Sequence, residues 1–322
     1  MENKLKNEID KIFQYNNNES KKIIPKKIMI EVTNSCNSKC IFCANRKMTR
    51  KRKNIDRDIA IKALEEGKKL NIDEVGIYVC GEPLLNPNLV EYIEMAKKLG
   101  YKYIYLTTNG ILADKEKVKK LFENGLNSIK FSINSINPEN YKKIHGVDCF
   151  NIVYQNLRDA YDVRNNSFKN CKIYVSYIKT KYNNFDDKEI KKKFSNYCDE
   201  IFIQQVRNQG GLISNIQSIK IDNLKITFPC YYPFNTVVIT CEGYISACCM
   251  DFQNYLVYGD LNKDCLENIW NNNLIKKFRQ LQMSGKLEKT ICNNCINNTF
   301  DKCEPLDEKY SKVINYKNWE NE

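Results

Sequence analysis

The sequence contains a single histidine, His145, and no long hydrophobic segment. This scarcity excludes most histidine-based chemistry, because general-base catalysis and histidine-rich zinc sites need a histidine at the right place. The longest apolar runs are strand-sized and far shorter than the about 18 residues that cross a membrane, so we expect no membrane association. The N-terminus has no apolar signal-peptide core, and we therefore expect a cytoplasmic protein.

Positive charge is in excess, with 51 lysines and arginines against 39 aspartates and glutamates in 322 residues. The hydrophobic share of 42% and the charged share of 28% are those of a folded globular protein with one large domain or two smaller ones. A net charge of +12 permits a nucleic-acid partner. Because no RNA-binding motif of the RRM or KH type is present, we expect no such partner.

Fifteen cysteines are the most informative feature of the composition. In a reducing compartment, clustered thiols bind metal more often than they form disulfides. Cys36, Cys40 and Cys43 form a C-x3-C-x2-C run. A zinc site would need four ligands, whereas three thiolates suit one face of a cubane iron–sulfur cluster and leave the fourth iron without a protein ligand. An open iron is what a cluster that binds a substrate needs.

The sequence around this run resembles the radical S-adenosylmethionine (radical SAM) enzymes, in which a C-x3-C-x-aromatic-C loop follows the first strand of a partial (β/α)6 barrel. Phe42 stands at the aromatic position, which in that family lies near the adenine of SAM. Gly81 and Glu82 match the G-G-E-P motif after the second strand, where the glutamate receives the methionine amino group. Cys80 stands in place of the first glycine of that motif.

Two further segments extend the resemblance over about residues 26–206. One ends the third strand and contains Thr108, and the other ends the fourth strand and contains Ser132 and Asn134. The resemblance implies that these three side chains contact SAM. His145 follows in a segment where the family commonly has arginine, so we interpret it as a loop residue rather than a catalyst.

The hydrophobic pattern of the same region predicts alternating strands and helices. Strands are expected at 27–32, 74–79, 102–107, 128–133, 172–178 and 200–206, and helices at 58–70, 88–99, 114–124, 150–163 and 186–197. This alternation predicts a parallel sheet with right-handed crossovers. In that architecture active residues lie at the C-terminal ends of the strands, where Cys36, Glu82, Thr108 and Ser132 all stand.

Four later cysteines, Cys230, Cys248, Cys292 and Cys295, resemble the ligands of the SPASM/twitch domain that follows many radical SAM barrels. The resemblance implies one auxiliary [4Fe–4S] cluster in addition to the SAM-binding [4Fe–4S] cluster of the first run. A zinc site built from the same four thiolates is the alternative. The cysteine spacing after Cys295 lacks the pattern of a second auxiliary cluster.

The C-terminal region is expected to form a small hairpin and a helix. Hairpin strands at 235–240 and 244–247 flank the turn at Glu242-Gly243, and one amphipathic helix is expected at 264–283. Its apolar face would consist of Ile269, Trp270, Leu274, Phe278 and Leu281. The remaining eight cysteines are expected to pack as small apolar residues: Cys80, Cys149, Cys171, Cys198, Cys241, Cys249, Cys265 and Cys303.

The expected fold class is α/β, with a partial (β/α)6 TIM-like radical SAM barrel followed by a small β-hairpin-plus-helix SPASM/twitch domain. The expected parts are an N-terminal helix (3–15) and lead-in at 1–25, the barrel at 26–206, a connector at 207–225, the auxiliary-cluster domain at 226–303 and a C-terminal tail at 304–322.

The resemblance implies an enzyme that reductively cleaves SAM to a 5′-deoxyadenosyl radical and abstracts a hydrogen atom from a substrate. We expect an oxidoreductase whose small-molecule substrate is a sugar-like or aminocyclitol-like alcohol, with the auxiliary cluster accepting an electron. A radical epimerase is the first alternative, with Cys249 as hydrogen-atom donor and Cys80 as a second candidate. A peptide-modifying maturase and a non-enzymatic iron–sulfur or zinc protein are the others.

Six cationic residues are concentrated in residues 46–53, directly after the first cysteine run. Three interpretations remain open for this segment. It could be a solvated loop, a docking site for an acidic electron donor such as flavodoxin or ferredoxin, or a binding site for an anionic substrate.

Overall fold

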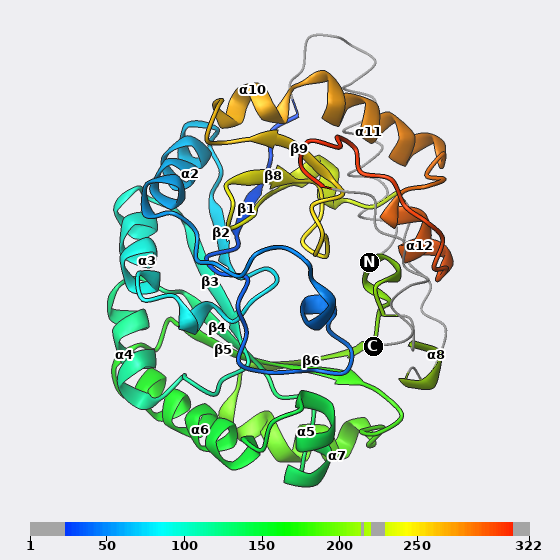
Figure 1. Cartoon of the computed structure of the whole chain (residues 1–322). Helices are drawn as coiled ribbons and strands as arrows, with labels where there is room; N and C mark the ends of the chain where they lie inside the picture. Colours follow the sequence, from blue (N-terminus) through cyan, green and yellow to red (C-terminus); the bar gives the residue numbers. More distant parts are fainter. Residues whose placement is uncertain (1–22, 214–215, 220–228, 312–322) are drawn as a thin grey trace.

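The computed structural model describes residues 23–213, 216–219 and 229–311, so the helix expected at 3–15 and the end of the tail lie outside it. Its strands form one sheet in the order β6-β5-β4-β3-β2-β1-β7-β8-β9 (Figure 1). The first six strands pair in parallel, which confirms the α/β class and the mostly parallel barrel sheet. They are β1 (Lys27–Ile30), β2 (Glu74–Ile77), β3 (Tyr103–Thr108), β4 (Ser128–Ser132), β5 (Lys172–Lys179) and β6 (Glu200–Gln205).

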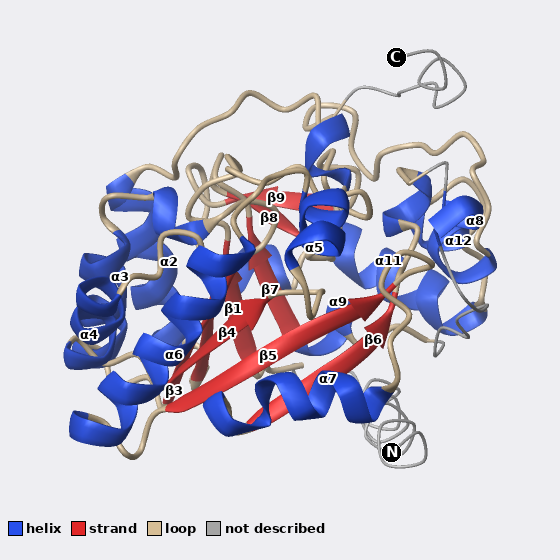
Figure 2. Cartoon of the chain, turned by 90° about the horizontal axis from the view of Figure 1, so that it is seen from below, coloured by secondary structure: helices blue, strands red, loops and turns tan. Residues whose placement is uncertain are grey.

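Helices between these strands cover the outer face of the curved sheet (Figures 1 and 2). They are α2 (Arg57–Lys69), α3 (Leu89–Lys98), α4 (Lys115–Glu123), α6 (Phe150–Ser167) and α7 (Asp187–Phe194). Side-chain caps define their starts, because the Asp114 carboxylate accepts a hydrogen bond from the Lys117 N–H at α4, and Asp186 forms a capping box with Glu189 at α7. The starts therefore lie where the sequence predicted them.

The two faces of the barrel sheet differ in chemistry. In β3, Ile104 and Leu106 belong to the hydrophobic core beneath the helices, whereas Tyr103 and Tyr105 alternate with them and point to the concave face. Gly76 in the neighbouring strand gives this face room, since a Cβ atom there would lie 2.8 Å from the Tyr105 ring. The concave face is thus lined by large polar aromatics rather than by aliphatic side chains.

The C-terminal strands continue the barrel sheet. Strand β7 (Thr236–Ile239) pairs in parallel with β1, so that Lys27 lies opposite Thr236. Strands β8 (Tyr244–Ser246) and β9 (Val257–Asp260) follow in antiparallel order. The predicted hairpin is present as β7 and β8, and β9 adds a strand that the sequence pattern did not indicate.

The prediction of a single helix at 264–283 is wrong, because two helices occupy this segment. They are α10 (Leu266–Trp270) and α11 (Asn273–Ser284). The Asn272 side chain accepts a hydrogen bond from the Ile275 N–H and so starts a new helix. Of the expected apolar face, Leu281 is 36% exposed, while Trp270 and Phe278 are buried.

The prediction that His145 lies in a loop is also wrong. Residues Pro138–His145 form helix α5, which the Asn137 side chain caps by accepting from the Asn140 N–H. Gly146 ends the helix in the left-handed conformation, with φ of 67°. His145 is therefore a buried residue of the last helical turn.

The remaining helices are short. They are α8 (Ile216–Ile219), α9 (Tyr232–Asn235), α12 (Ile291–Asn297), and the 3-10 turns η1 (Ala44–Lys47), η2 (Pro83–Leu85), η3 (Ser195–Tyr197) and η4 (Gln209–Gly211). Among the described helices, none combines the length and the apolar content needed to cross a membrane.

Candidate active site

The first cysteine run lies in the loop between β1 and α2, which crosses the mouth of the curved sheet in Figure 1. Two backbone hydrogen bonds tie this cluster loop to the end of α5. The Lys39 N–H donates to the His145 carbonyl oxygen at 2.8 Å, and the Ile41 N–H donates to the Ile144 carbonyl oxygen at 2.9 Å. Helix α5 therefore fixes the position of the three half-buried thiols.

Burial raises the pKa of all three thiols of this loop, and that of Cys43 to about 11. The pKa of Cys40 is raised mainly by burial and further by the neighbouring Cys43 and Cys36. As anionic ligands they therefore need a cation to compensate their charge. Their sulfur atoms do not converge within 4.8 Å of one another as ligands of a single ion would, so they suit a cluster with separate irons.

His145 is a buried neighbour of these thiols. Its Nε2 lies 2.7 Å from the Ile133 carbonyl oxygen, so Nε2 carries the hydrogen and Nδ1 faces the Cys40 sulfur at 3.4 Å. Burial lowers its pKa to about 4, so the ring is neutral at physiological pH. Tyr141 stacks on it with centroids 4.1 Å apart, and Phe42 packs edge-on at 6.4 Å. The four-residue spacing of Tyr141 and His145 is the sequence signal that could have indicated a helix.

Gly81 allows the second motif to approach the cluster loop closely. A Cβ atom at this position would lie 2.3 Å from the Thr33 carbonyl oxygen and 2.6 Å from the Ser35 carbonyl oxygen. The N–H of Glu82 donates to the same Ser35 oxygen at 2.8 Å. The glycine is needed for close approach, because its φ is not positive.

Glu82 is fully buried and its carboxylate accepts three hydrogen bonds. The donors are the Thr108 hydroxyl at 2.7 Å, the Asn109 N–H at 2.7 Å and the Leu84 N–H at 3.1 Å. Burial raises the pKa of Glu82 to about 7. In the described part of the chain no cation pairs with this carboxylate, so an ammonium group of a ligand would complete it.

Asn109 is a residue of this site that the sequence analysis did not single out. Its side-chain amide donates to the Asn37 side-chain oxygen at 2.7 Å and to the Ser38 hydroxyl at 3.2 Å. Both acceptors lie in the cluster loop, so Asn109 joins this loop to Glu82. Its place beside Thr108 in the motif was the available signal.

The two remaining positions of the motif set lie after and within β4. Ser132 is half-buried at the C-terminal end of that strand. Asn134 is buried with φ of 55°, and its side-chain oxygen accepts from the Ile178 N–H at 2.7 Å. Through this hydrogen bond to Ile178 of β5, the Asn134 side chain holds the turn that follows β4.

The second cysteine group comes from three segments whose thiols lie close enough to influence one another. Cys292 and Cys295 share the single helix α12, Cys230 precedes α9, and Cys248 follows β8. Burial raises the pKa of Cys230 to about 11 and that of Cys292 well above its usual value, and the thiols reinforce the shift in one another. The Gln282 amide nitrogen, which is buried without a hydrogen-bond partner, lies beside Cys292 and would donate to a thiolate or sulfide there.

Cys249 lies between this auxiliary site and the barrel. A hydrogen bond shared with Cys248 raises the pKa of Cys248 and lowers that of Cys249, and Tyr232 also donates to Cys249. The thiol of Cys80 lies 4.0 Å from the Cys249 carbonyl oxygen, so the two candidate hydrogen donors belong to neighbouring segments. Of the eight cysteines expected to be packed, Cys80, Cys198, Cys241 and Cys303 are buried and the other four are half-buried.

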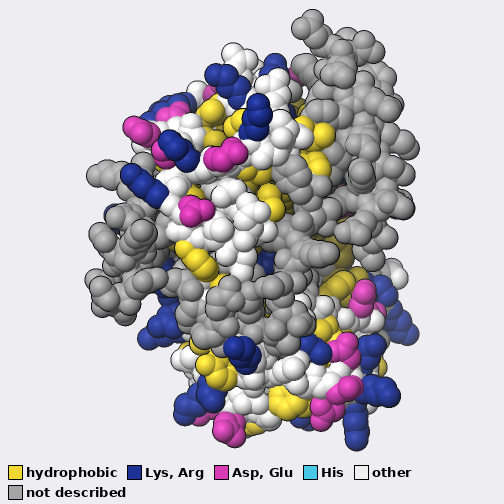
Figure 3. Space-filling view, turned by 90° about the vertical axis from the view of Figure 1, so that its right-hand side faces the viewer, with side chains coloured by type: hydrophobic (Ala, Val, Ile, Leu, Met, Phe, Trp, Pro, Cys, Tyr) yellow, Lys and Arg dark blue, Asp and Glu magenta, His cyan; other side chains and the backbone are white. Residues whose placement is uncertain are grey.

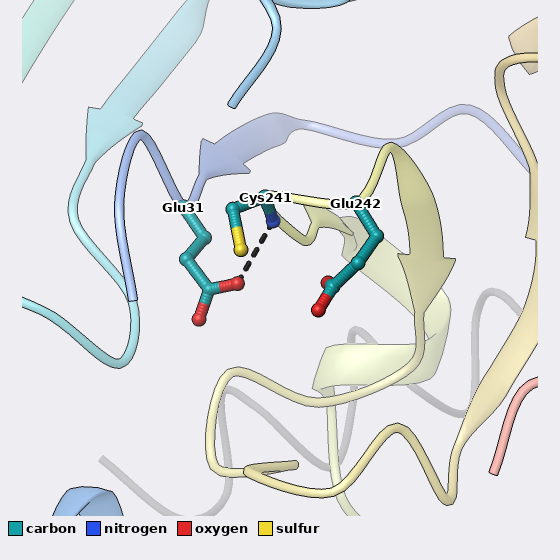
Figure 4. Close-up of side chains that lie close together, drawn as sticks. All are labelled: Glu31, Cys241 and Glu242. Atoms are coloured by element: carbon teal, nitrogen blue, oxygen red, sulfur yellow. Dashed lines mark hydrogen bonds between the residues drawn. The ribbon is translucent and has the colours of Figure 1, made fainter. Parts of the chain in front are cut away.

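Among the described residues, one group of three potential ligand atoms lies within 4.8 Å, formed by Glu31, Cys241 and Glu242 (Figure 4). The Cys241 N–H donates to the Glu31 carboxylate at 2.8 Å. The guanidinium of Arg50 pairs with both carboxylates, with Nη2 at 2.6 Å from Glu242. This group is therefore a buried ion pair that joins the end of β1 to the β7–β8 turn, and the arginine already supplies its positive charge.

The basic segment 46–53 is consequently more than a solvated loop. Arg50 is buried in the ion pair, and the Arg52 guanidinium donates to the Asn34 carbonyl oxygen at 2.6 Å and to Asn45. Two of its six cations thus hold the cluster loop itself. On the face drawn in Figure 3, cationic and acidic side chains are mixed.

Residues 30–190 match the family model of the radical SAM superfamily, which is half of the chain. The chain belongs to the radical SAM superfamily. Residues 230–296 match the SPASM model, described as an iron–sulfur cluster-binding domain, and cover all four cysteines of the second group. Both expected resemblances are confirmed.

Among curated proteins, this radical SAM chain is 33% identical over 202 residues to an uncharacterized protein of Methanocaldococcus jannaschii, covering 61% of this chain and 63% of that one. It is 34% identical over 136 residues to a probable GTP 3′,8-cyclase of Saccharolobus islandicus, covering 42% and 44%. The chain thus spans less than two thirds of the length of these relatives.

Among solved structures, the chain is similar to BtrN in complex with AdoMet and 2-DOIA, with a TM-score of 0.58, 20% identity, and coverage of 90% of this chain and 98% of that one. Streptococcus suis SuiB bound to precursor peptide SuiA gives a TM-score of 0.64, 14% identity, and coverage of 83% and 69%. Native anSMEcpe with bound AdoMet gives 0.59, 16%, and coverage of 91% and 94%. These likenesses show the fold.

Membership of the radical SAM superfamily with a SPASM domain implies SAM and [4Fe–4S] clusters as cofactors. The residues fit these groups. Three half-buried thiols lie together in one loop, Glu82 is a buried carboxylate that pairs with no cation among the described residues, and Gln282 has a buried amide nitrogen without a hydrogen-bond partner beside the second thiol set.

Proposed function

We propose that this radical SAM enzyme oxidises an alcohol group of a small molecule, sugar-like or aminocyclitol-like, inside the barrel. One observation carries the proposal: the auxiliary thiol set adjoins the barrel interior. The carbonyl oxygen of Cys249, which directly follows Cys248, lies 4.0 Å from the sulfur of Cys80, two residues after Tyr78 of the concave face. A second redox centre beside the substrate provides a place for the electron that oxidation releases.

We assign Cys36, Cys40 and Cys43 to the SAM-binding cluster and Glu82 to the methionine amino group of SAM. When bound, the cluster and SAM supply reductive cleavage to a 5′-deoxyadenosyl radical. The task of the chain is to orient and to exclude water. The Glu82 carboxylate, held by the Thr108 hydroxyl, would fix the ammonium group and thereby the direction of the sulfonium.

We assign Phe42, Gly81, Ser132 and Asn134 to the walls of the SAM site. Phe42 is buried against His145, which keeps that side of the site apolar. Ser132 ends a barrel strand at the same edge as Glu82. Asn134 would act through the turn that it holds.

We assign Cys230, Cys248, Cys292 and Cys295 to the auxiliary cluster. Conversion of an alcohol to a carbonyl group removes one hydrogen atom, one electron and one proton. The hydrogen atom would leave toward the SAM site beside Glu82. The electron would leave toward the auxiliary thiol set. The aromatic side chains of the concave face would keep water from the radical in between.

Epimerisation is a second candidate because the Cys249 thiol, next to Cys248, adjoins the same interior. Peptide modification is a third, since the solved structures of similar fold include SuiB bound to a precursor peptide and anSMEcpe bound to a peptide. For the electron donor, we propose that the cations of segment 46–53 outside the ion pair dock an acidic flavodoxin or ferredoxin.

The test uses anaerobic protein loaded with both clusters, SAM, a reductant, and panels of sugars and aminocyclitols. Oxidation yields a product lighter by two hydrogen atoms and one 5′-deoxyadenosine per product. A product of unchanged mass in ordinary water, which takes up one deuterium when the reaction runs in heavy water, would instead establish an epimerase. That deuterium should disappear in Cys249→Ala and persist in the matched control Cys265→Ala. Absence of 5′-deoxyadenosine with every compound rejects the proposal.

A further inference from the structure

The concave face of the barrel carries one lysine among aromatic side chains. Lys130 lies in the middle of β4, where its alternation with the core residues Ile129 and Phe131 directs it into the barrel. Its register partners are Thr107 in β3 and Tyr174 in β5. Lys130 is thus enclosed by strands on both sides.

An aromatic belt surrounds the Lys130 ammonium group. Its Nζ lies 5.9 Å from the Tyr78 ring centroid and 5.7 Å from the Phe202 ring centroid. Tyr105 contacts Tyr78 edge-on at 5.8 Å, and Tyr174 contacts Phe202 at 5.5 Å. These rings stabilise a cation, but they do not neutralise its charge.

Lys130 has no acidic partner in the described part of the chain, where it forms neither an ion pair nor a hydrogen bond. Burial lowers its pKa, and the charged group that acts in the opposite direction is the thiol of Cys249. Lys130 is half-buried, and a charge withdrawn from water is costly unless it is paired. The nearest positions on this face are serine, threonine, tyrosine and phenylalanine, and Glu200, opposite Tyr174 in β6, forms no ion pair with Lys130, which leaves the pairing to a ligand.

The position of Lys130 matches that of a substrate anchor. It precedes Ser132 by two residues on the same face of β4, and Ser132 ends the strand at the edge that carries Glu82 and the cluster loop. On the other side its Nζ lies 5.9 Å from the Tyr78 ring, and Cys80, two residues further on, has its sulfur 4.0 Å from the Cys249 carbonyl oxygen at the auxiliary site. A molecule bound to Lys130 would therefore lie between the two cysteine sets.

We propose that Lys130 binds a carboxylate group of the substrate inside the barrel, which narrows the substrate to a small hydroxy acid or sugar acid. This inference rests on the proposed function, because it takes the barrel interior as the place of the substrate. One ammonium group matches the single charge of a carboxylate, whereas phosphates are commonly bound by several cations and N–H groups together. The same lysine would repel the amino groups of an aminocyclitol.

The test is protection of Lys130 from reductive methylation in the cluster-loaded protein with SAM, under anaerobic conditions. A brief pulse of formaldehyde and a mild borane reductant is followed by peptide mass spectrometry. Acetate is the probe, with sodium chloride and inorganic phosphate at matched ionic strength as comparisons. Lys115, which is exposed on α4, is the internal control for general screening.

Acetate should protect Lys130 saturably, by about tenfold at ten times the half-protecting concentration, and should leave Lys115 at its rate in chloride. Gluconate should protect Lys130 at a lower concentration than the peptide trialanine, because the proposed substrate is a small hydroxy acid or sugar acid and not a peptide with a terminal carboxylate. Equal rates in acetate and chloride, stronger protection by phosphate than by acetate, or stronger protection by trialanine than by gluconate would each overturn the inference.

The labelling requires no turnover, so it is independent of the proposed oxidation. Production of 5′-deoxyadenosine and of an oxidised product by the wild-type enzyme tests the function. Protection without oxidation leaves the carboxylate site standing and removes the oxidase assignment. Oxidation of a neutral or cationic alcohol without protection removes the carboxylate site and leaves the oxidase.

Discussion

At the scale of single residues, Glu82 shows how the site is built around a missing positive charge. Its carboxylate accepts three hydrogen bonds, yet burial outweighs them and raises its pKa to about 7. A carboxyl group with a raised pKa favours its protonated form until an ammonium group arrives. The ligand-free site is therefore prepared for SAM at a cost in stability.

SAM binding should strengthen as the pH rises from about 6 and level off above about 8, one unit beyond the pKa, because only the ionised carboxylate attracts the ammonium group. Glu82→Gln should weaken binding strongly and remove this pH dependence. Equilibrium dialysis of anaerobic cluster-loaded protein measures it, with Glu94→Gln on the exposed face of α3 as the matched control. A pH-independent wild-type affinity would contradict the assignment.

The same pKa makes the ligand-free protein less stable at higher pH. The folded pKa of about 7 lies above the ordinary value of 4.5, so the folded state holds the proton longer than the unfolded chain. Because of this group alone, the free energy of unfolding should fall by about 3 kcal/mol as the pH rises from 4.5 to about 7. It should stay constant at higher pH. Urea unfolding of wild type and Glu82→Gln across this pH range measures the difference, which should shrink in the variant.

Gly81→Ala tests whether the second motif must approach the cluster loop closely. The φ angle of Gly81 is not positive, so an alanine there is not strained by its backbone conformation. The added Cβ would overlap the Thr33 and Ser35 carbonyl oxygens, so we expect a loss of about 1–3 kcal/mol and a displaced cluster loop. Thermal unfolding and iron content of the reconstituted protein measure both. Gly100→Ala is the comparison, because its Cβ meets no atom within 4 Å although its φ is +80°, and it should leave iron content unchanged.

At the scale of elements, the Arg50 ion pair joins three segments: the end of β1, the cluster loop and the β7–β8 turn. Removing one partner of a buried pair leaves an uncompensated charge. Arg50→Met should therefore lower the free energy of unfolding by about 3–5 kcal/mol and reduce the iron content at both sites. Arg57→Met is the matched control, because its pair with Glu91 is exposed and should cost less than about 1 kcal/mol. Equal losses would show that Arg50 has no special role.

Much of the barrel could be predicted because its elements are periodic and capped. The six strands and their helices follow from alternation, with Asp114 and Asp186 marking helix starts. Helix α5 was missed because a motif match was interpreted as a loop, although Asn137 caps it and Gly146 ends it. The break at Asn272 was missed because the apolar spacing continues across it, while a side-chain cap outweighs that spacing.

The residues of the candidate site that belong to known motifs could be predicted from the sequence. Those that the fold brings together from distant segments could not. Glu82 and Thr108 were identified from the motif, and they do form a hydrogen bond. Lys130 carried no signal, because a lysine within a strand does not reveal that Tyr78, which follows β2, and Phe202 of β6 lie beside it in the folded sheet. Arg50 was grouped with exposed cations, because the sequence does not show that Glu31 lies beside it.

At the scale of the whole molecule, the barrel and the SPASM region share one sheet. Strand β1 is hydrogen-bonded to β2 on one side and to β7 on the other. Truncation after residue 225 would therefore expose the β1 edge and remove the partner of Arg50 at Glu242. We expect the truncated chain to aggregate or unfold, as size-exclusion chromatography and circular dichroism would show. A soluble truncated chain that binds one cluster would contradict this expectation.

The continuity of β1 with β7 also has a kinetic meaning. Ile30 lies opposite Ile239 at the end of β1, just before the chain enters the loop with the first thiols. A hinge motion between β1 and β7, the strands beside the two candidate cluster sites, would have to break this strand pairing. Electron exchange between the sites would accordingly proceed at a fixed separation, governed by tunnelling rather than gated by domain opening.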